Sequence, residues 1–315
     1  MGKYILKRIG MMLLTLFLII SIAFFVLRLM PGSPFDDPEL SEETIEMLED
    51  KLHLNDPLIV QYGYFLKGIF LENDWGVSYK LRPGHGAFDV IMERVGPTML
   101  LNILSLFISL PLGILTGTLA AVFKGKWPDN LISFAVIICI SVPSFVFASL
   151  LQYFAAGQWD LFPLIYNVKG DWMARLHSLV LPVMALAFSP IATVCRYLRG
   201  ELIETLSSEY MLLARTKGLK MSQAVVRHAF RNSMVPLANI IIPMFTNIMG
   251  GSLVVETIFS VPGIGGILVD SINAMDHSLT IAALLFYSFI SLATILVVDI
   301  SYGIIDPRIR LGAKN

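Results

Sequence analysis

The sequence Ala-Arg-Thr-Lys-Gly at residues 214–218 lies in a basic segment that decides what kind of protein this is. Between Arg196 and Met234 there are seven Lys or Arg residues and three Glu residues, and a long apolar stretch stands on each side. A basic loop between two membrane spans is retained in the cytoplasm. The segment therefore predicts a membrane protein with a cytoplasmic loop long enough to have a task of its own.

Apolar stretches recur along the whole chain. Hydrophobic residues make up 56% of the sequence and charged residues 15%, and several uncharged runs approach the ~20 residues that cross a bilayer as a helix. Helices are required because an open strand edge in lipid would leave backbone groups unpaired. The sequence predicts an all-α membrane protein with six transmembrane helices, at about Ile9–Leu29, Thr98–Phe123, Leu131–Ala155, Ser178–Val194, Val235–Ile258 and Ile281–Tyr302.

The distribution of positive charge predicts the topology. Fifteen Lys and Arg residues lie on the side of the basic segment, and seven lie on the other side. Both termini are therefore expected in the cytoplasm. The first apolar stretch starts with basic residues but has no small-residue cleavage site, so we interpret it as a retained anchor rather than a signal peptide.

The largest exterior loop, residues 31–97, is acidic in its first part. Asp and Glu occupy eight positions between Asp36 and Asp50, and Ser41 stands where it can cap a short helix with an acidic first turn. This acidic face could dock an external partner or could simply face water. The residues alone leave both interpretations open.

Small and polar residues recur on one face of two predicted spans, at the 100° spacing of a helix. One interpretation is a wet stripe that lines a solute path. The other is a packing surface, because small and polar residues are also where membrane helices approach closely. The residues concerned are Ser141, Ser144 and Gln152 in the third span, where Pro143 predicts a kink, and Asn239, Thr246 and Gly250 in the fifth.

Glu256 is the charge inside a span that most suggests a function, because such charges are costly in a membrane. It precedes an apolar segment, residues 257–266, that is rich in Gly and Pro and free of Lys and Arg. Gly263, Gly265 and Gly266 are expected to permit backbone conformations closed to other residues. The segment is therefore predicted to be structured rather than a loose loop.

The sequence carries no catalytic or metal-binding pattern. It lacks the Gly-Lys-Ser/Thr phosphate loop, the His-Glu-x-x-His metal motif and the Gly-x-Ser-x-Gly nucleophile elbow. Its five histidines are scattered over both sides of the membrane, and its two cysteines suggest no disulfide or metal site. We therefore expect a chain that is not an enzyme and that binds no metal or cofactor of its own.

The basic segment is predicted to form a helical elbow. The fourth span is expected to continue as a helix through Leu213, followed by a break at Gly218 and a second short helix from Ser222 to about Asn232. Apolar and basic sides on this second helix suit it to a groove on a partner protein, although an interfacial amphipathic helix has the same pattern. Nucleic acid is not favoured, since interleaved aromatic residues are missing.

Several motifs together resemble a known family over nearly the whole chain. In the N-terminal third they are Tyr4–Arg8, Met30–Pro34, Leu54–Pro57 and Asp74–Ser78, and in the rest they are Ala214–Leu219, Arg227–Asn232, Pro236, Glu256–Gly265 and Asp306–Arg308. These motifs resemble the permease subunits of ABC importers of the oligopeptide, dipeptide and nickel branch, most closely the B-type subunit. One departure stands in the cytoplasmic loop: the general motif of these importers begins Glu-Ala-Ala, whereas here Leu212, Leu213 and Ala214 occupy those positions.

The resemblance implies a fold and a set of partners. The fold would be that of a type I ABC importer permease, with residues 1–30 as the first transmembrane helix, 31–97 as an extracytoplasmic domain, 94–303 as a five-helix core with the coupling loop 196–234, and 304–315 as a cytoplasmic tail. The partners would be a paralogous C-type permease, two cytoplasmic ATPase subunits, an extracytoplasmic peptide-binding protein and the lipid bilayer of a bacterial cell membrane. ATP and Mg²⁺ would bind to the ATPase subunits.

The resemblance also implies roles for particular residues. The two polar stripes would line the translocation path. The residues expected to contact the ATPase are Ala214, Arg215, Thr216, Lys217, Gly218, Leu219, Val226 and Phe230. Those expected to form an outer gate are Glu256, Phe259, Pro262, Gly263 and Gly265.

The substrate is not resolved by the sequence. Oligopeptides are the preferred interpretation, with dipeptides or nickel as alternatives within the same branch. A different class, an autonomous ion-coupled transporter, would be expected to show inverted repeats and ionisable residues at mid-membrane, and no clear repeat is visible.

Overall fold

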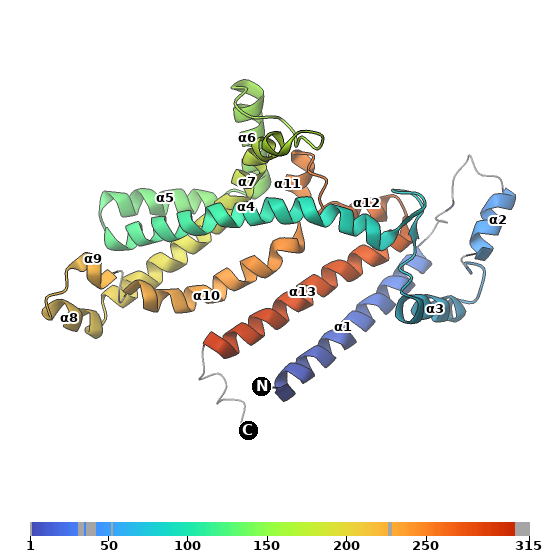
Figure 1. Cartoon of the computed structure of the whole chain (residues 1–315), viewed down its shortest axis with the longest axis horizontal. Coiled ribbons are helices and arrows are strands. Elements are labelled where there is room, and N and C mark those ends of the chain that lie inside the picture. Colours follow the sequence, from blue (N-terminus) through green and yellow to red (C-terminus); the bar gives the residue numbers. More distant parts are fainter. Residues whose placement is uncertain (1, 31–34, 36–41, 52, 226–228, 306–315) are drawn as a thin grey trace. The chain divides into compact units, whose positions relative to one another are not determined.

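The computed structural model describes residues 2–30, 35, 42–51, 53–225 and 229–305, and these are almost entirely helical (Figure 1). The chain divides into two compact units. Unit 1 comprises Met1–Gly96 and Gly263–Leu292, and unit 2 comprises Pro97–Pro262 and Ala293–Asn315. Ser41, the predicted helix cap, and Asp306–Arg308 lie outside the described residues.

Unit 1 contains the first membrane helix, most of the predicted exterior loop and the start of the last helix. Its elements are α1 (Gly2–Leu29), α2 (Glu42–Lys51), α3 (Leu58–Lys67), the π-helical turn η1 (Gly68–Glu72), β1 (Val77–Ser78), β2 (His85–Gly86), α12 (Ile267–Asn273) and the beginning of α13 (His277–Ile305). The two short strands pair antiparallel, with Val77 opposite Gly86 and Ser78 opposite His85. They are the one departure from the all-α prediction among the described residues.

Asp276 joins two distant parts of unit 1. One of its carboxylate oxygens accepts hydrogen bonds from Ser78 Oγ at 2.5 Å and from the backbone N–H groups of Lys80 and Leu81, each at 3.2 Å. The other accepts the backbone N–H of Leu279 at 3.3 Å and so caps the start of α13. The hairpin and the last helix are therefore held by the same buried carboxylate.

Unit 2 is built around its most buried helix, α7 (Trp172–Leu206) (Figure 1). Helices α5, α6 and α10 pack along α7. The elements of the unit are most of α4 (Ala87–Val122), α5 (Trp127–Ser141), α6 (Ser144–Leu151), the π-helical η2 (Gln152–Gln158), α7, α8 (Glu209–Thr216), α9 (Met221–Ala224), α10 (Phe230–Thr246), the 3-10 turn η4 (Asn247–Gly250) and α11 (Leu253–Ile258).

Helices α4 and α7 cross closely at two glycines. A Cβ atom on Gly117 would lie 2.8 Å from the carbonyl oxygen of Cys195, and one on Gly113 would lie 2.8 Å from the Cβ of Val194. The spacing of the two glycines is the small-xxx-small pattern that lets membrane helices approach each other. The absence of side chains at these positions therefore sets the distance between α4 and α7.

Four described helices are long and apolar enough to cross a membrane, namely Ile5–Leu29, Ala87–Val122, Trp172–Leu206 and His277–Ser301. A fifth candidate is the pair Trp127–Ser141 and Ser144–Gln158, which meet at an angle of 100°. The span predicted over Leu131–Ala155 is therefore two helices, and the kink predicted at Pro143 is present as a break between them. Val142 between the two helices is extended, with φ −88° and ψ 123°, because the residue before a proline is driven out of the α region.

The predicted helix Val235–Ile258 is also wrong as a continuous span. Helix α10 ends at Thr246, the turn η4 follows, and α11 begins only at Leu253. Gly251 lies between them with φ +66°, a conformation that interrupts a right-handed helix. The apolar part of α10, Pro236–Phe245, is shorter than the other candidate spans.

Candidate coupling surface and gate segment

The basic segment forms two short helices at the end of α7. The prediction of one helix through Leu213 is wrong, because α7 ends at Leu206 and α8 begins at Glu209. The hydroxyl of Ser207 donates to the carbonyl of Ile203 at 2.8 Å, and that of Ser208 to the carbonyl of Thr205 at 2.5 Å. Such local bonds compete with the continuation of a helix.

The predicted break at Gly218 is present. Gly218 has φ +87°, which lies in the left-handed region that favours glycine, and it separates α8 from α9. The described residues of the predicted second helix, Ser222 to Asn232, are helical. They belong to α9 (Met221–Ala224), to the π-helical positions Val225 and Ala229, and to the start of α10, which continues to Thr246. Residues 226–228 lie outside the described part of the chain.

One side of this elbow is packed against the end of α7. Met211 of α8 and Ala224 of α9 are buried in a cluster with Leu198 and Leu202 of α7. Phe230, predicted as an ATPase contact, is partly buried against the same cluster. The elbow is therefore attached to α7 by apolar packing, and moving it independently of α7 would expose this cluster.

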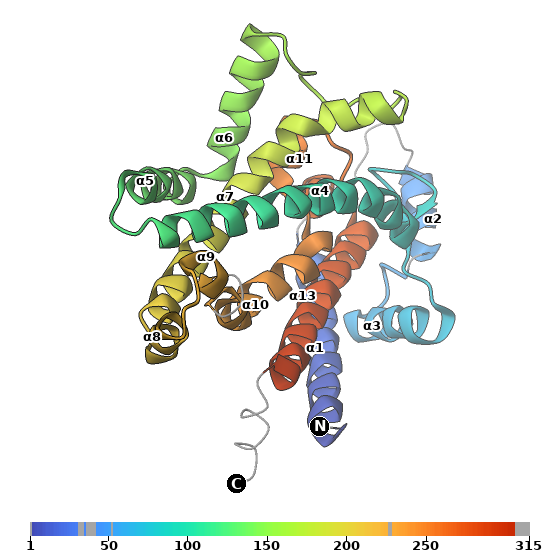
Figure 2. The same cartoon turned by 60° about the vertical axis from the view of Figure 1, so that its left-hand side comes forward.

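The other side of α8 is exposed and apolar. Leu212 and Leu213 are 65% and 56% exposed, and Thr216, Lys217 and Gly218 beyond them are exposed as well. Figure 2 shows α8 and α9 beside the end of α7. Two large apolar side chains next to a Lys form a surface that could be covered by a partner. We call Leu212, Leu213, Thr216, Lys217 and Gly218 the coupling surface.

The sequence prediction overlaps this surface only in part. It includes Thr216, Lys217 and Gly218 but not the two leucines. Three consecutive apolar residues, Met211 to Leu213, cannot all face the inside of a helix, so the exposed leucines were readable from the sequence. Ala214 and Arg215 lie in α8, Leu219 is partly buried, and Val226 lies outside the described residues.

An ion pair with a buried carboxylate fixes α5 to α7 near the elbow. Arg199 donates from Nε to Asp129 Oδ1 at 2.6 Å and from Nη2 to Asp129 Oδ2 at 2.8 Å. The same carboxylate accepts the N–H of Gly125 at 2.9 Å and the hydroxyl of Ser133 at 3.3 Å. A bidentate pair of this kind fixes orientation as well as distance. The turn between α4 and α5 is thereby held to α7 two turns before that helix ends.

Glu256 of the gate segment, residues 256–265, is buried rather than directed to an interface. Glu256 is 3% exposed, and its carboxylate accepts a hydrogen bond from Thr98 Oγ1 at 2.9 Å. It also accepts the backbone N–H of Ser252 at 3.3 Å, at the start of α11. Glu256 therefore ties α11 to α4.

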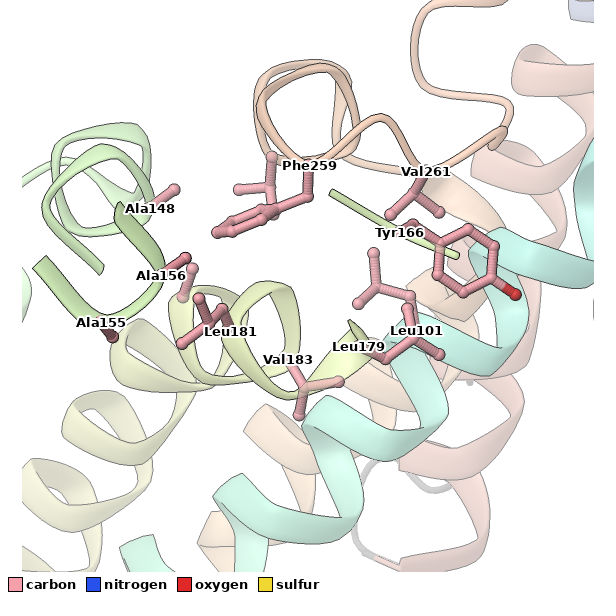
Figure 3. Close-up of a cluster of buried hydrophobic side chains, with 12 residues drawn as sticks. Leu101, Ala148, Ala155, Ala156, Tyr166, Leu179, Leu181, Val183, Phe259 and Val261 are labelled. Atoms are coloured by element: carbon pink, nitrogen blue, oxygen red, sulfur yellow. The ribbon is translucent and has the colours of Figure 1, made fainter. Parts of the chain in front are cut away.

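Phe259 follows α11 and is fully buried. Figure 3 shows its ring pointing toward Ala148 of α6 and Ala156 of η2. Its carbonyl accepts the N–H of Tyr166 at 2.8 Å. The gate segment is thus packed against the loop and helices that precede α7.

Gln152, predicted to line the path, uses both amide hydrogens to fasten these parts together. Nε2 donates to the carbonyl of Leu164 at 2.9 Å and to the carbonyl of Ile258 at 2.8 Å. It lies at the start of η2, where α6 gives way to wider turns. Its position in the structure joins the bent span to the end of α11.

The backbone of the gate segment differs from the prediction. The residue with positive φ is Ser260, at φ +53°, and not one of the glycines expected to permit such a conformation. Gly266 has φ −84°, an ordinary value for any residue. Gly263 is buried, Gly265 is partly buried and Pro262 is exposed. The turn after α11 is accordingly made by a residue that no sequence rule singles out.

The two predicted polar stripes are not continuous. Ser141 ends α5 and Ser144 begins α6, so the 100° bend separates them. In the fifth span Asn239 is an exposed residue of α10, Thr246 is its last residue, and Gly250 ends η4. The interpretation of each set as one helical face is therefore wrong, because both helices break within the stripe.

Two family models match this chain end to end. The binding-protein-dependent transport system inner membrane component matches residues 110–311, and the N-terminal component of the same systems matches residues 1–110. The chain belongs to this family. It is a multi-pass permease of the inner membrane and a non-catalytic component of its transporter. The resemblance inferred from the sequence motifs is confirmed.

Similar proteins align with this permease over their full length. It is 40% identical to the dipeptide transport system permease protein DppB of Lactococcus lactis subsp. cremoris, over 99% of this chain and 100% of that protein. It is 33% identical to DppB of Bacillus subtilis, over 100% of both chains. It is 34% identical to the oligopeptide transport system permease protein OppB of Escherichia coli, over 98% of this chain and 100% of that protein. A chain of the MetNI methionine ABC transporter, in an inward-facing conformation, has 16% identity and a TM-score of 0.49 over 67% of this permease and 95% of that chain.

Proposed function

We propose that this permease is the B-type membrane subunit of an ATP-driven peptide importer. It forms half of the translocation path with a paralogous C-type permease and receives force from two cytoplasmic ATPase subunits. An extracytoplasmic binding protein delivers the peptide. The full-length similarity to permeases named for dipeptide and oligopeptide transport supports this assignment.

The observation that carries the proposal is the two-sided elbow of α8. Met211 anchors it to α7, whereas Leu212 and Leu213 face outward beside Lys217. A short helix that is rigidly attached on one side and apolar on the other suits a groove on an ATPase subunit. Closure of the ATPase pair on ATP and Mg²⁺ would then displace α7 through the elbow, as a rigid body.

The topology that accompanies the proposal has six spans and both termini in the cytoplasm. Helices α1, α4, α7 and α13 cross as single helices. The bent pair α5 and α6 with η2 forms a further span, and α10 followed by η4 and α11 forms the sixth. In this topology the elbow lies in the cytoplasm and the domain at residues 31–97 lies outside, while the fifth-span residue Asn239 and the bend near Ser144 face the path.

The gate segment has a matching role. Glu256, Phe259 and Gln152 hold α11 against α4, α6 and η2, so residues 256–262 can move as one piece with these elements of unit 2. We assign the gate segment, with Pro262, Gly263 and Gly265, to the outer gate that closes after the peptide has entered.

The relatives of this permease are named for peptides of different length. Relatives named for dipeptides and for oligopeptides are both similar at 33–40% identity, and oligopeptide import is our preferred assignment. Nickel is the third alternative within the branch. The family assignment removes the alternative of an autonomous ion-coupled transporter, because the family operates with a binding protein.

The decisive experiment is reconstitution of the permease pair with its ATPase subunits and binding protein. The ATPase subunits are expected to co-purify with the permease. ATP hydrolysis in proteoliposomes is expected to rise when the binding protein carries a peptide, and parallel assays with dipeptides, pentapeptides and Ni²⁺ rank the substrates. A permease that co-purifies with no ATPase, or hydrolysis that ignores the loaded binding protein, would show the assignment to be wrong.

A further inference from the structure

Unit 1 contains a cavity of about 160 Å³ that the proposed transport mechanism does not use. A cavity must offer roughly 10–15 Å³ to hold one water molecule. This cavity is about ten times larger and has room for a polar group of several atoms. Four segments of unit 1 meet there: the end of α1, α3 with η1, the loop after η1 and the start of α13. The lining residues include Arg28, Tyr64, Asp74, Trp75, His277 and Ser278.

Arg28 brings a positive charge into this cavity without a carboxylate partner. Its guanidinium lies 5.5 Å from the ring centroid of Phe24, and it forms no ion pair with any residue in the described part of the chain. The side chain is only partly exposed. A guanidinium so placed, with five donors in a planar fork, is suited to an oxyanion.

His277 adds an imidazole ring to the wall of the same cavity. Its Nδ1 is buried and has no hydrogen-bond partner among the described residues. A buried polar atom without a partner costs free energy, and an imidazole nitrogen that carries a proton can donate to an oxyanion. Arg28 and the ring of His277 therefore line one cavity, where the guanidinium is the group that an anion would satisfy.

Asp74 lines the cavity as well and introduces the opposite charge. One of its carboxylate oxygens accepts the N–H of Gly76 at 2.8 Å, and it forms no ion pair with Arg28. A simple anion would gain nothing from this carboxylate. A group that carries both an anion and an ammonium would match Arg28 and Asp74 at the same time.

The cavity lies where two candidate membrane spans end. Arg28 is the penultimate residue of the apolar span Ile5–Leu29, and His277 is the first residue of the apolar span His277–Ser301. Trp75 and Tyr64 in its wall are the residue types that gather at the level of lipid headgroups. Along α1, the apolar side chains of Ile22 and Val26 are exposed and can contact acyl chains.

We propose that this cavity binds the headgroup of a phospholipid, with the phosphate at Arg28 and His277 and an ammonium group, as in phosphatidylethanolamine, at Asp74. The phosphate is the recognised anion and basic pockets beside membrane helices are suited to it. The inference uses the membrane placement of α1 and α13, and it does not depend on which peptide is transported. In the proposed topology the lipid belongs to the extracytoplasmic leaflet.

Native mass spectrometry of the purified transporter tests the proposal with defined lipids. Detergent-solubilised complex is incubated with phosphatidylethanolamine, phosphatidylglycerol or diacylglycerol with the same acyl chains, and the retained lipid is counted. The wild type is expected to retain phosphatidylethanolamine best and diacylglycerol least. Equal retention of diacylglycerol, which has no phosphate, would overturn the proposal without any variant.

Variants locate the site. Arg28→Gln is expected to lower phosphatidylethanolamine retention about tenfold, the loss that follows removal of one charge-assisted hydrogen bond. Arg82→Gln is the matched control, because Arg82 is an exposed cation of the same unit, paired with Glu93 and outside the cavity. Unchanged retention in a folded Arg28→Gln complex would overturn the proposal. If that variant does not assemble, His277→Phe must show the loss instead.

Two further measurements test whether free phosphate can replace the lipid and whether the ammonium group is recognised separately. Displacement of the lipid by excess inorganic phosphate would show that the phosphate group alone is recognised, and Asp74→Asn is expected to abolish the preference for phosphatidylethanolamine over phosphatidylglycerol. A wild type with no such preference would contradict the role given to Asp74. Peptide-stimulated ATP hydrolysis, measured on the same preparations, reports separately on the proposed transport function.

Discussion

The carboxylate of Asp129 accepts two hydrogen bonds from Arg199, at 2.6 and 2.8 Å, across 70 residues of sequence. The Asp129 side chain is 3% exposed and that of Arg199 is 33% exposed. The pair is therefore intermediate in burial between a fully buried and an exposed ion pair. It holds the turn after α4 to the part of α7 that leads into the elbow.

Asp129→Asn is expected to destabilise the permease, because it removes the charge that Arg199 and Gly125 recognise while keeping the shape of the side chain. Loss of one partner of a buried pair costs about 3–5 kcal/mol, and the partial exposure of Arg199 places the expected loss at the lower end of that range. Thermal unfolding of the purified complex measures it.

Glu93→Gln is the control for that change. It breaks the exposed pair of Arg82 and Glu93, for which the expected cost is about 0–1 kcal/mol. Equal loss of stability in the two variants would show that Asp129 and Arg199 behave as an ordinary surface pair.

Replacement of both Leu212 and Leu213 by Asp is expected to separate the permease from its ATPase subunits. Each leucine contributes about 1.5–3 kcal/mol when it is covered by a partner, so the affinity should fall about a hundredfold or more. Co-purification of tagged permease with the ATPase subunits measures the loss. Leu161→Asp serves for comparison, since Leu161 is 58% exposed in unit 2 but outside the coupling surface. Full co-purification of the double variant would contradict the role of the elbow.

Gly218→Ala is expected to reduce the stimulation of ATP hydrolysis by the loaded binding protein, because alanine at φ +87° is strained by about 1–2 kcal/mol. Gly218→Pro should abolish the stimulation, since proline fixes φ near −65°. Gly125→Ala is the control variant, because it introduces a similar backbone strain at φ +75° in the turn between α4 and α5. If Gly125→Ala reduced stimulation as much as Gly218→Ala, general strain and not the elbow would explain the effect.

Gly117→Ala and Gly200→Ala are expected to change stability in opposite directions. A methyl group at Gly117 meets the backbone of Cys195 at 2.8 Å, whereas nothing lies within 4 Å of one at Gly200. Overpacking should cost about 1–3 kcal/mol at Gly117, and the better helix propensity of alanine should add a few tenths to about 1 kcal/mol at Gly200. Unfolding temperatures of the two variants, compared with the wild type, check the signs. A neutral Gly117→Ala would mean that α7 can shift away from α4.

The sequence predicted the parts of this fold that depend on local pattern. The apolar runs locate α1, α4, α7 and α13, and the glycine at position 218 marks the break in the elbow. The breaks at Val142 and after Thr246 were only partly readable. Pro143 predicts a kink, but the 100° angle depends on how α5 and α6 pack along α7. The break at Ser207 and Ser208 contains neither Gly nor Pro, the residues from which a helix break is usually predicted.

Contacts between distant residues could not be predicted from one sequence. Nothing in the sequence pairs Asp129 with Arg199, or Thr98 with Glu256, because each contact depends on how two helices are placed. The glycines at positions 113 and 117 are a different case, since their spacing is a known signal of close helix packing. In the candidate site, the loop and its glycine were found, but the exposed Leu212 and Leu213 were missed.

The carboxylate of Asp276 has a consequence for how the chain matures. Ser78 and its partner are 198 residues apart, so during synthesis the turn at residues 78–81 leaves the ribosome long before the group that satisfies it. The early part of unit 1 must wait while the helices of unit 2 are inserted. Because contacts of such long separation form slowly, completion of unit 1 is expected to be a late step in biogenesis, and a chain truncated before Asp276 would expose an unfinished hairpin to quality-control proteases.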